Sequence, residues 1–311
     1  MRIKLYAVLM LLASAVVIYA LLSLTNALGN LSQINAAFAA FAALLYLLSI
    51  FVWNHAWVEQ IRTQVPDVPT WPMNWAGFAA VIGIVFPLNV GPDFFRGLFG
   101  RRWAGFRQAF AASLSTKFFK SVIILASSIT IFVAMLQQGV SQPLVVGILF
   151  GVFIIVLMMS IVLAVRKRSN ARKIFGILTF TKRVKREEIE GFADILSKSL
   201  CTHRLEVWGL LALSWLLEFA AFAVAFIAVT PITDAVRLYL IFSIMLLLSM
   251  TPWPRGIGAV EAGGFLLLQG IGAQTAALFI ALWAIVRIWV PLLAATMATY
   301  RLGLGQEIDL H

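Results

Sequence analysis

Seven long apolar runs divide this chain, and they constrain its fold more than any other feature. They cover residues 5–28, 34–57, 108–136, 143–165, 207–229, 235–250 and 273–300. Most of them reach the ~20 mostly apolar residues that an α-helix needs to cross a bilayer. Hydrophobic residues make up 62% of the chain and charged residues only 12%, whereas soluble domains have about 45–50% and about 25%. We therefore predict an all-α polytopic membrane protein with about seven spanning helices.

Two further apolar stretches, 75–97 and 251–272, are interrupted by proline and glycine. The first contains FPLNVGPDFFRG and the second contains TPWPRGIGAVEAGG. Backbone groups freed by proline cannot stay bare in hydrocarbon, so such segments lie against protein or line a cavity. We predict that both stretches are re-entrant, with helices that begin near Pro92, because proline is favoured at the first helical position, and near Gly258.

Basic residues predict the topology. Eleven of the 24 Lys and Arg residues fall between Arg166 and Arg204. Because cytoplasmic loops carry an excess of Lys and Arg, we place loop 166–206 inside and expect a short amphipathic helix in it. Arg2 and Lys4 place the N-terminus inside as well. The net charge of +11 then indicates anionic lipid headgroups, rather than nucleic acid, as the neighbours of these charges.

The chain is predicted to be a single membrane domain over 1–311, in a bacterial or archaeal cytoplasmic membrane. The first apolar run exceeds the ~7–15 residues of a signal-peptide core, so we expect it to be retained as a helix. A helix pair, a break and a long helix occur twice, at 5–137 and 207–300. Such repeated halves are typical of transporters, whose sites lie at discontinuous helices.

Four tryptophans flank the segment 58–74. Trp side chains are enriched at membrane–water interfaces, so their clustering predicts an interfacial belt formed by Trp53, Trp57, Trp71 and Trp75.

Charged side chains within the apolar runs and at the breaks are our candidate substrate-binding residues, because ionisable groups inside a membrane are costly and mark functional sites. Asp93 and Arg96 share a face if a helix starts at Pro92. Arg287 is the expected partner of Glu261, either as a structural clamp or in a transport pathway. The full predicted set is Asp93, Arg96, Lys117, Lys120, Glu218, Arg255, Glu261 and Arg287.

Run 108–136 exceeds one bilayer crossing, and its first part carries three hydroxyl residues and two lysines. It is predicted to be either a separate half-helix or the wall of a polar cavity. Lys117 and Lys120 could receive a phosphate, although Lys120 could also snorkel to the interface. Glu218 could pair with either lysine or carry a proton.

The sequence motifs of several enzyme classes are absent. The chain has no P-loop, no His-Glu-x-x-His and no Gly-x-Ser-x-Gly. Its single cysteine, Cys201, excludes an internal disulfide, and three scattered histidines do not predict a metal site. We expect no catalytic residues, no metal, no cofactor and no enzymatic activity.

The sequence PRGIGAVE at 254–261, followed by Arg287 in AIVRIWVP, resembles the lysylphosphatidylglycerol synthase transmembrane family. Residues 89–96, followed by 113–120, are similar to the first-half motif of that family, but Gly91, Pro92 and Asp93 depart from its usual form. The resemblance implies a module like the flippase portion of the multiple peptide resistance factor, which moves aminoacylated phosphatidylglycerol between leaflets. The cytosolic aminoacyltransferase domain of full-length synthases is not seen, so lysyl transfer is not expected.

Our leading hypothesis is a lipid flippase, whose polar groove at the two breaks carries the headgroup of a phospholipid or a lipid-linked substrate. The alternative is a non-transporting membrane partner of a lipid- or glycan-modifying enzyme, docked through the basic loop. A second copy of the chain is a further candidate partner. Two other hypotheses are an intramembrane enzyme and a transporter of water-soluble solutes.

Overall fold

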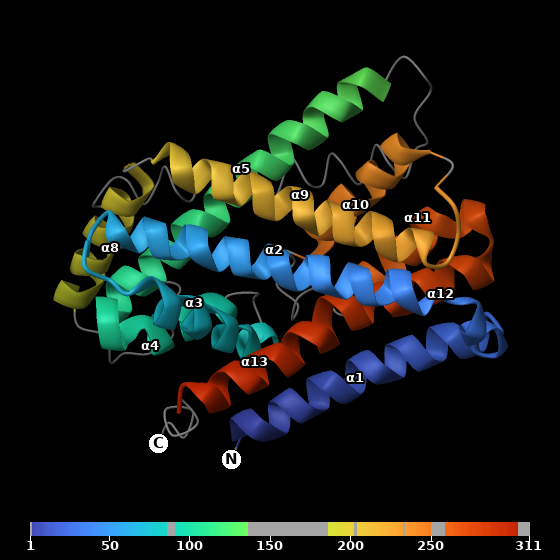
Figure 1. The fold of residues 1–311 in the computed structure, drawn as a ribbon, viewed down its shortest axis with the longest axis horizontal. Coiled ribbons are helices and arrows are strands. Elements are labelled where there is room, and N and C mark those ends of the chain that lie inside the picture. The colour runs from blue at the N-terminus through green and yellow to red at the C-terminus, as the bar shows by residue number, and fades with distance from the viewer. Residues whose placement is uncertain are drawn as a thin grey trace.

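The computed structural model describes residues 2–85, 91–135, 186–201, 204–232, 234–249 and 259–303. Within these ranges it contains helices and no strand, and most of the long helices run along the long axis of the molecule (Figure 1). The all-α prediction is therefore confirmed. The predicted span 143–165 and the predicted site residue Arg255 lie outside the described residues.

The main helices follow the predicted runs closely. They are α1 Arg2–Leu24, α2 Ala36–Arg62, α3 Thr70–Ala79, α4 Gly91–Ala104, α5 Phe106–Met135, α8 Arg186–Cys201, α9 Leu205–Ile227, α10 Ala235–Ser249, α11 Ala259–Leu268, α12 Ala273–Ala284 and α13 Val290–Arg301. A π-helical turn, Ile285–Trp289, joins α12 to α13. Short 3-10 turns are η1 Leu28–Gln33, η2 Ala80–Val85 and η6 Gln269–Ile271.

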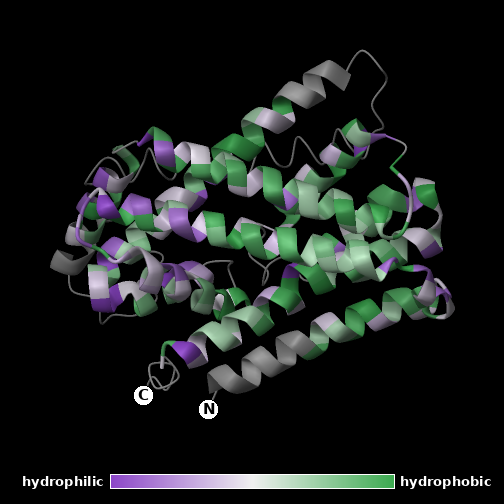
Figure 2. Cartoon of the chain, in the orientation of Figure 1, coloured by the Kyte–Doolittle hydropathy of each residue, from purple (hydrophilic) through white to green (hydrophobic). Residues whose placement is uncertain are grey.

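In the described part of the chain, four helical stretches are long and apolar enough to cross a membrane: Ala36–Arg62, Phe106–Ile129, Leu205–Ile227 and Ala273–Arg301. Three shorter helical stretches are also apolar: Leu12–Leu24, Ala235–Leu246 and Val260–Ile271. Hydrophobic residues dominate the middle of the bundle, and hydrophilic ones gather at its ends (Figure 2). This distribution suits a bundle whose middle lies in hydrocarbon.

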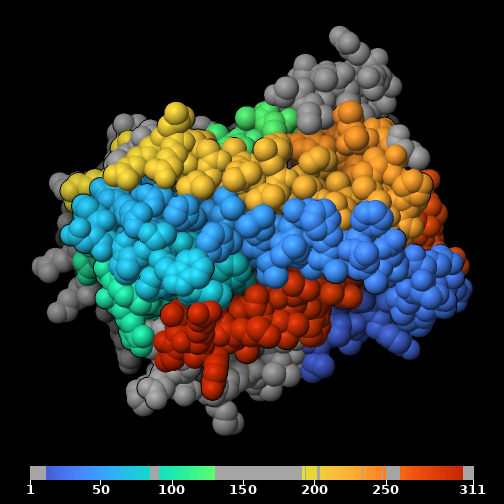
Figure 3. Space-filling model, in the orientation of Figure 1, coloured from blue at the N-terminus to red at the C-terminus, as the bar shows by residue number. Residues whose placement is uncertain are grey.

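Aromatic packing joins the central helices. Helices α2 and α9 lie side by side across one face (Figure 3). The ring centroid of Phe222 in α9 lies 5.0 Å from those of Phe279 and Trp283 in α12 and 5.2 Å from that of Phe242 in α10. Because lipid tails are as apolar as these side chains, close packing rather than exclusion of water favours this arrangement.

The two ends of the bundle differ. Helices α3, α4 and α8 gather at one end, called here the α8 end (Figure 1). The other, called here the η1 end, is held by hydrogen bonds between loops. There, Asn30 Nδ2 donates to Gln274 Oε1 at 3.1 Å and the Asn35 amide donates to the Ala228 carbonyl at 2.8 Å.

The first break has the expected helix start. Helix α4 begins at Gly91, with Pro92 and Asp93 in its first turn. Gly83 of η2 lies so close that an added Cβ would be 2.4 Å from the Gly91 carbonyl carbon. Helix α3 has 10 residues, or about 15 Å, which is half of a ~30 Å hydrocarbon core. Re-entrance into a membrane and the repeat relation of 5–137 to 207–300 stay predictions.

The structure decides between two alternatives for α5 and corrects one prediction about a tryptophan. Helix α5 is continuous from Phe106 to Met135, so its first part is not a separate half-helix, whereas Lys117 and Lys120 line a cavity, as the other alternative predicted. The interfacial role is wrong for Trp57, which is fully buried and donates Nε1–H to the Ala109 carbonyl at 2.9 Å. Helix α2 continues past Trp57 to Arg62, which carries this indole into the protein interior, whereas Trp71 is exposed.

The amphipathic helix expected in the basic loop is present as α8. Its Phe192 and Leu196 pack against Ala111 of α5. Gln60 of α2 donates Nε2–H to the Ser199 carbonyl at 2.7 Å. These contacts hold α8 against α2 and α5.

Candidate functional site

A cavity lies among α2, α4, α5, α9, α10 and the π turn. Its space amounts to about 810 Å³, including the part open to the surroundings. Apolar side chains such as Tyr46, Ile50 and Leu246 form part of its wall. Six of the eight predicted site residues also line it: Asp93, Arg96, Lys117, Lys120, Glu218 and Arg287.

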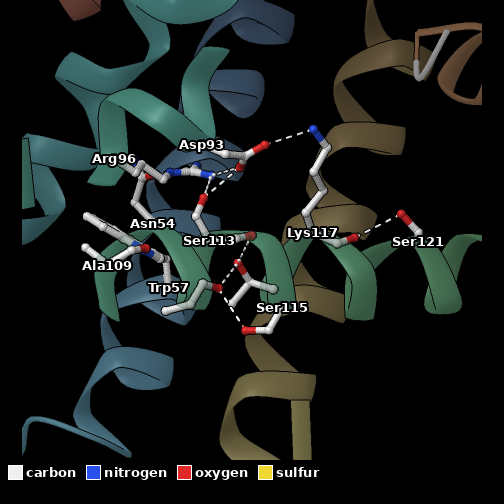
Figure 4. A network of polar contacts seen from close by, with 11 residues as sticks. Asn54, Trp57, Asp93, Arg96, Ala109, Ser113, Ser115, Lys117 and Ser121 are labelled. Carbon is white, nitrogen blue, oxygen red and sulfur yellow. Dashed lines mark hydrogen bonds and ion pairs between the residues drawn. The ribbon is translucent and has the colours of Figure 1, made fainter. Parts of the chain in front are cut away.

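Asp93 is the centre of the first charged cluster (Figure 4). Its Oδ1 accepts a hydrogen bond from Ser113 Oγ at 2.7 Å, and its Oδ2 accepts one from Lys117 Nζ at 2.9 Å. Arg96 Nη1 lies 3.6 Å from Oδ1 and donates to Ser113 Oγ at 3.2 Å, while Nη2 donates to Asn54 Oδ1 at 2.8 Å. Asp93 and Arg96 are 1% and 2% exposed, so each needs this compensation.

Local sequence explains the cluster. Asp93 lies in the first turn of α4, where a negative charge is favoured by the helix dipole. Ser113 and Lys117 are four residues apart on α5 and therefore share one face. The predicted i, i+3 pairing of Asp93 with Arg96 is confirmed.

Lys120 forms the second cluster. Its Nζ donates to Glu218 Oε2 at 2.7 Å and to Ser214 Oγ at 3.2 Å. Ser214 and Glu218 are four residues apart on α9, so both reach the same ammonium group. Lys120 is 6% exposed and Glu218 is 7% exposed. The snorkelling alternative for Lys120 is therefore wrong, and Lys120 is the lysine that pairs with Glu218.

Trp53 links the two clusters, and sequence reasoning missed this role. Its ring centroid lies 4.6 Å from Arg96 Cζ and 4.5 Å from Lys120 Nζ. Its Nε1 and the Nδ2 of Asn54 are buried and have no hydrogen-bond partner among the described residues. Asn54, a polar residue inside an apolar run, was the feature of the sequence that could have indicated a polar site on this helix. Two donors near the cavity thus remain open to an acceptor.

Glu261 and Arg287 form the third charged contact. Arg287 Nη2 donates to Glu261 Oε1 at 2.9 Å, and both side chains are 4% exposed. Glu261 lies in the first turn of α11, and Arg287 lies in the π turn. Such π turns are frequent at functional sites. The predicted pair is confirmed, and Arg287 connects it to the cavity.

The charges of these three contacts do not cancel. Among the described residues, four cations (Arg96, Lys117, Lys120 and Arg287) face three acids (Asp93, Glu218 and Glu261). Four minus three leaves one positive charge in excess among these seven side chains, in a site surrounded by apolar helices. Such a site favours an anion, because the anion removes the uncompensated charge.

In the part of the chain that the structure describes, one group of potential metal ligands lies outside this cavity. The ligand atoms of His55, Glu59 and Glu206 lie within 4.8 Å of one another. However, Glu59 Oε1 accepts a hydrogen bond from Arg62 at 2.6 Å, and its Oε2 lies 3.8 Å from Arg204. Two guanidinium groups thus already neutralise this carboxylate, which makes the trio a poor cation site.

Comparisons with known proteins give the family. No curated protein matches the sequence, and no solved structure does. Residues 6–295 match the family described as Lysylphosphatidylglycerol synthase TM region. The match includes both broken segments and every charged residue of the cavity. The chain therefore belongs to the lysylphosphatidylglycerol synthase TM region family, a membrane domain associated with lipid-related transport or synthesis.

Proposed function

We propose that this protein is a flippase that moves a lipid with an anionic, phosphate-bearing headgroup between the two leaflets. The observation that carries the proposal is the cavity among apolar helices, whose described charged side chains and their partners have one cation in excess. The headgroup would enter this cavity while the acyl chains stay in the bilayer. This division matches the apolar outer surface, where Leu44, Leu213 and Leu216 are exposed.

The ion pairs provide a way to compensate the buried lysines both when the cavity is empty and when it holds substrate. Without substrate, Asp93 and Glu218 compensate the lysines, which would otherwise be costly inside a membrane. A phosphate group carries acceptor oxygens that can replace these carboxylates at Lys117 and Lys120, and it can accept from the indole N–H of Trp53. Exchange of one acceptor for another lets the headgroup pass without leaving a bare cation.

Exposed arginines support an orientation with the α8 end inside. Arg101, Arg102, Arg107 and Arg204 are all exposed and belong to elements at that end (Figure 1). Cytoplasmic surfaces carry such an excess of basic residues. With the inside negative, outward movement of one negative charge is favoured by about 2.3 kcal/mol per 100 mV, so an anionic lipid can move outward without a coupled ion.

Transport by purified full-length protein in liposomes tests the proposal. Phosphatidylglycerol with a fluorescent acyl chain would report leaflet exchange, and a neutral glycolipid with the same chain would serve as the phosphate-free comparison. We expect wild-type protein to move the first and not the second. Lys120→Gln should reduce the rate at least about tenfold, because a charged hydrogen bond contributes about 1.5–3 kcal/mol.

Arg101→Gln is the matched control, since it removes one exposed positive charge outside the cavity. Folding of each variant is checked by its melting temperature in detergent. Equal rates for both lipids, or an unchanged rate in a folded Lys120→Gln variant, would refute the proposal. Absence of transport in every lipid, with a lipid-modifying enzyme co-purifying, would favour the non-transporting partner instead.

A further inference from the structure

A second hollow lies at the η1 end of the bundle, between α9, α10, the end of α11 and η6. Its space amounts to about 420 Å³, including the part open to the surroundings. Its apolar wall is formed by Phe226, Leu238, Ile241, Leu267, Leu268 and Ile271. Two charged residues, Asp234 and Arg237, complete the lining. None of these residues belongs to the central cavity.

Arg237 lies exposed at the rim of this hollow, in the first turn of α10. Its guanidinium rests against the backbone of Gly270, where an added Cβ would be 3.2 Å from Nη2. Asp234 does not neutralise it: the Asp234 Oδ1 atom accepts from the Arg237 backbone N–H at 2.9 Å and so caps α10. Among the described residues, no carboxylate forms an ion pair with Arg237.

The position of Arg237 is unusual for its charge. The exposed arginines of α4, α5 and α13, and Arg204 at the N-cap of α9, lie at the α8 end, where Arg301 Cζ, for example, lies 5.0 Å from the Trp75 ring. Within the described ranges, Arg237 is the one basic residue at the η1 end. Basic residues are disfavoured on the side opposite the cytoplasm, so Arg237 stands out there as a candidate contact for an anionic group.

We propose that this hollow binds a phospholipid of the leaflet at the η1 end, with its phosphate on Arg237 and one acyl chain along the apolar wall. A cation beside six apolar side chains matches the two parts of an amphiphile, whereas a free phosphate would leave the apolar wall unused. The flanking residues Val236 and Leu266 are 45% and 64% exposed, as expected of a surface that faces lipid. The bound lipid bridges α10 and η6 and does not enter the central cavity.

Photolabelling locates this lipid independently of transport. The purified full chain, in detergent micelles, is incubated with phosphatidylglycerol carrying a diazirine in its acyl chain, illuminated, and digested for mass spectrometry. Labels are expected on Leu238, Ile241 and 267–271. Labels at the central cavity would serve as an internal reference, since Arg237 does not contribute to that site.

Arg237→Gln should reduce labelling of 267–271 at least about tenfold, because charged hydrogen bonds to phosphate are strong. Arg101→Gln, which removes an exposed arginine at the α8 end, should leave this labelling unchanged. A diazirine-bearing diacylglycerol, which lacks phosphate, should label the hollow weakly, and excess inorganic phosphate should not displace the phospholipid.

Three results would overturn the proposal. They are equal labelling of 267–271 in Arg237→Gln and wild type, equal labelling by diacylglycerol, and complete displacement by inorganic phosphate. The last would identify the site as one for a free anion. Because Arg237 is exposed and no described carboxylate pairs with it, Arg237→Gln should fold, and an unchanged melting temperature checks this. The transport assay tests the flippase proposal separately, so either proposal can fail alone.

Discussion

Replacing both members of the Glu261–Arg287 pair separates its structural role from its role in substrate binding. The two side chains are 4% exposed, and Nη2 lies 2.9 Å from Oε1. Removing one member takes away the ion-pair partner of a buried charge, which costs about 3–5 kcal/mol, whereas replacing both by apolar residues is often neutral or stabilising. Glu261→Met and Arg287→Met should therefore each reduce the ratio of folded to unfolded protein by a factor of about 100 or more.

The double variant should behave differently in the two assays. We expect its stability, measured by reversible denaturation in detergent micelles, to return to that of the wild type or above. If the proposed flippase binds its substrate's phosphate through Arg287, transport in liposomes should still be reduced at least about tenfold, because the double variant lacks that charged hydrogen bond.

Two results would refute this reasoning. A single variant as stable as the wild type would show that the remaining buried charge does not destabilise the protein when this partner is removed. A double variant that folds and transports like the wild type would show that the pair is only a clamp between α11 and the π turn.

Two further predictions concern Trp53 and the contact of η2 with α4. Trp53→Leu should lower the free energy of unfolding by about 2–4 kcal/mol, since the indole contacts two cations in a desolvated site. Trp53→Phe should lower it less, because it keeps an aromatic ring. Equal losses of the two variants, measured by denaturation, would contradict this. Gly83→Ala should destabilise the protein by about 3 kcal/mol, because its Cβ would lie 2.4 Å from the backbone of Gly91. Gly209→Ala is the control: it has nothing within 4 Å of its Cβ and should raise the melting temperature slightly. If Gly83→Ala leaves the free energy of unfolding unchanged, the close contact with Gly91 is not supported.

Sequence alone determined the elements of this fold and part of its site. Apolar runs of spanning length predict helices because a bilayer leaves the backbone no other way to satisfy its hydrogen bonds. The start of α4 and that of α11 followed from proline, glycine and acidic residues, which act within one helical turn. Glu261 could be matched to Arg287 because each was a charge in apolar surroundings that required an opposite partner.

Tertiary structure alone decided which helices meet. Lys117 and Lys120 are three residues apart on α5, yet one pairs with Asp93 of α4 and the other with Glu218 of α9, 98 residues away. No spacing in the sequence encodes that choice, because it depends on how three helices are rotated against one another. Trp53 shows the same limit: an indole suits a membrane interface and a charged cavity equally, and only the packing of α2 against α4 and α5 places it between two cations.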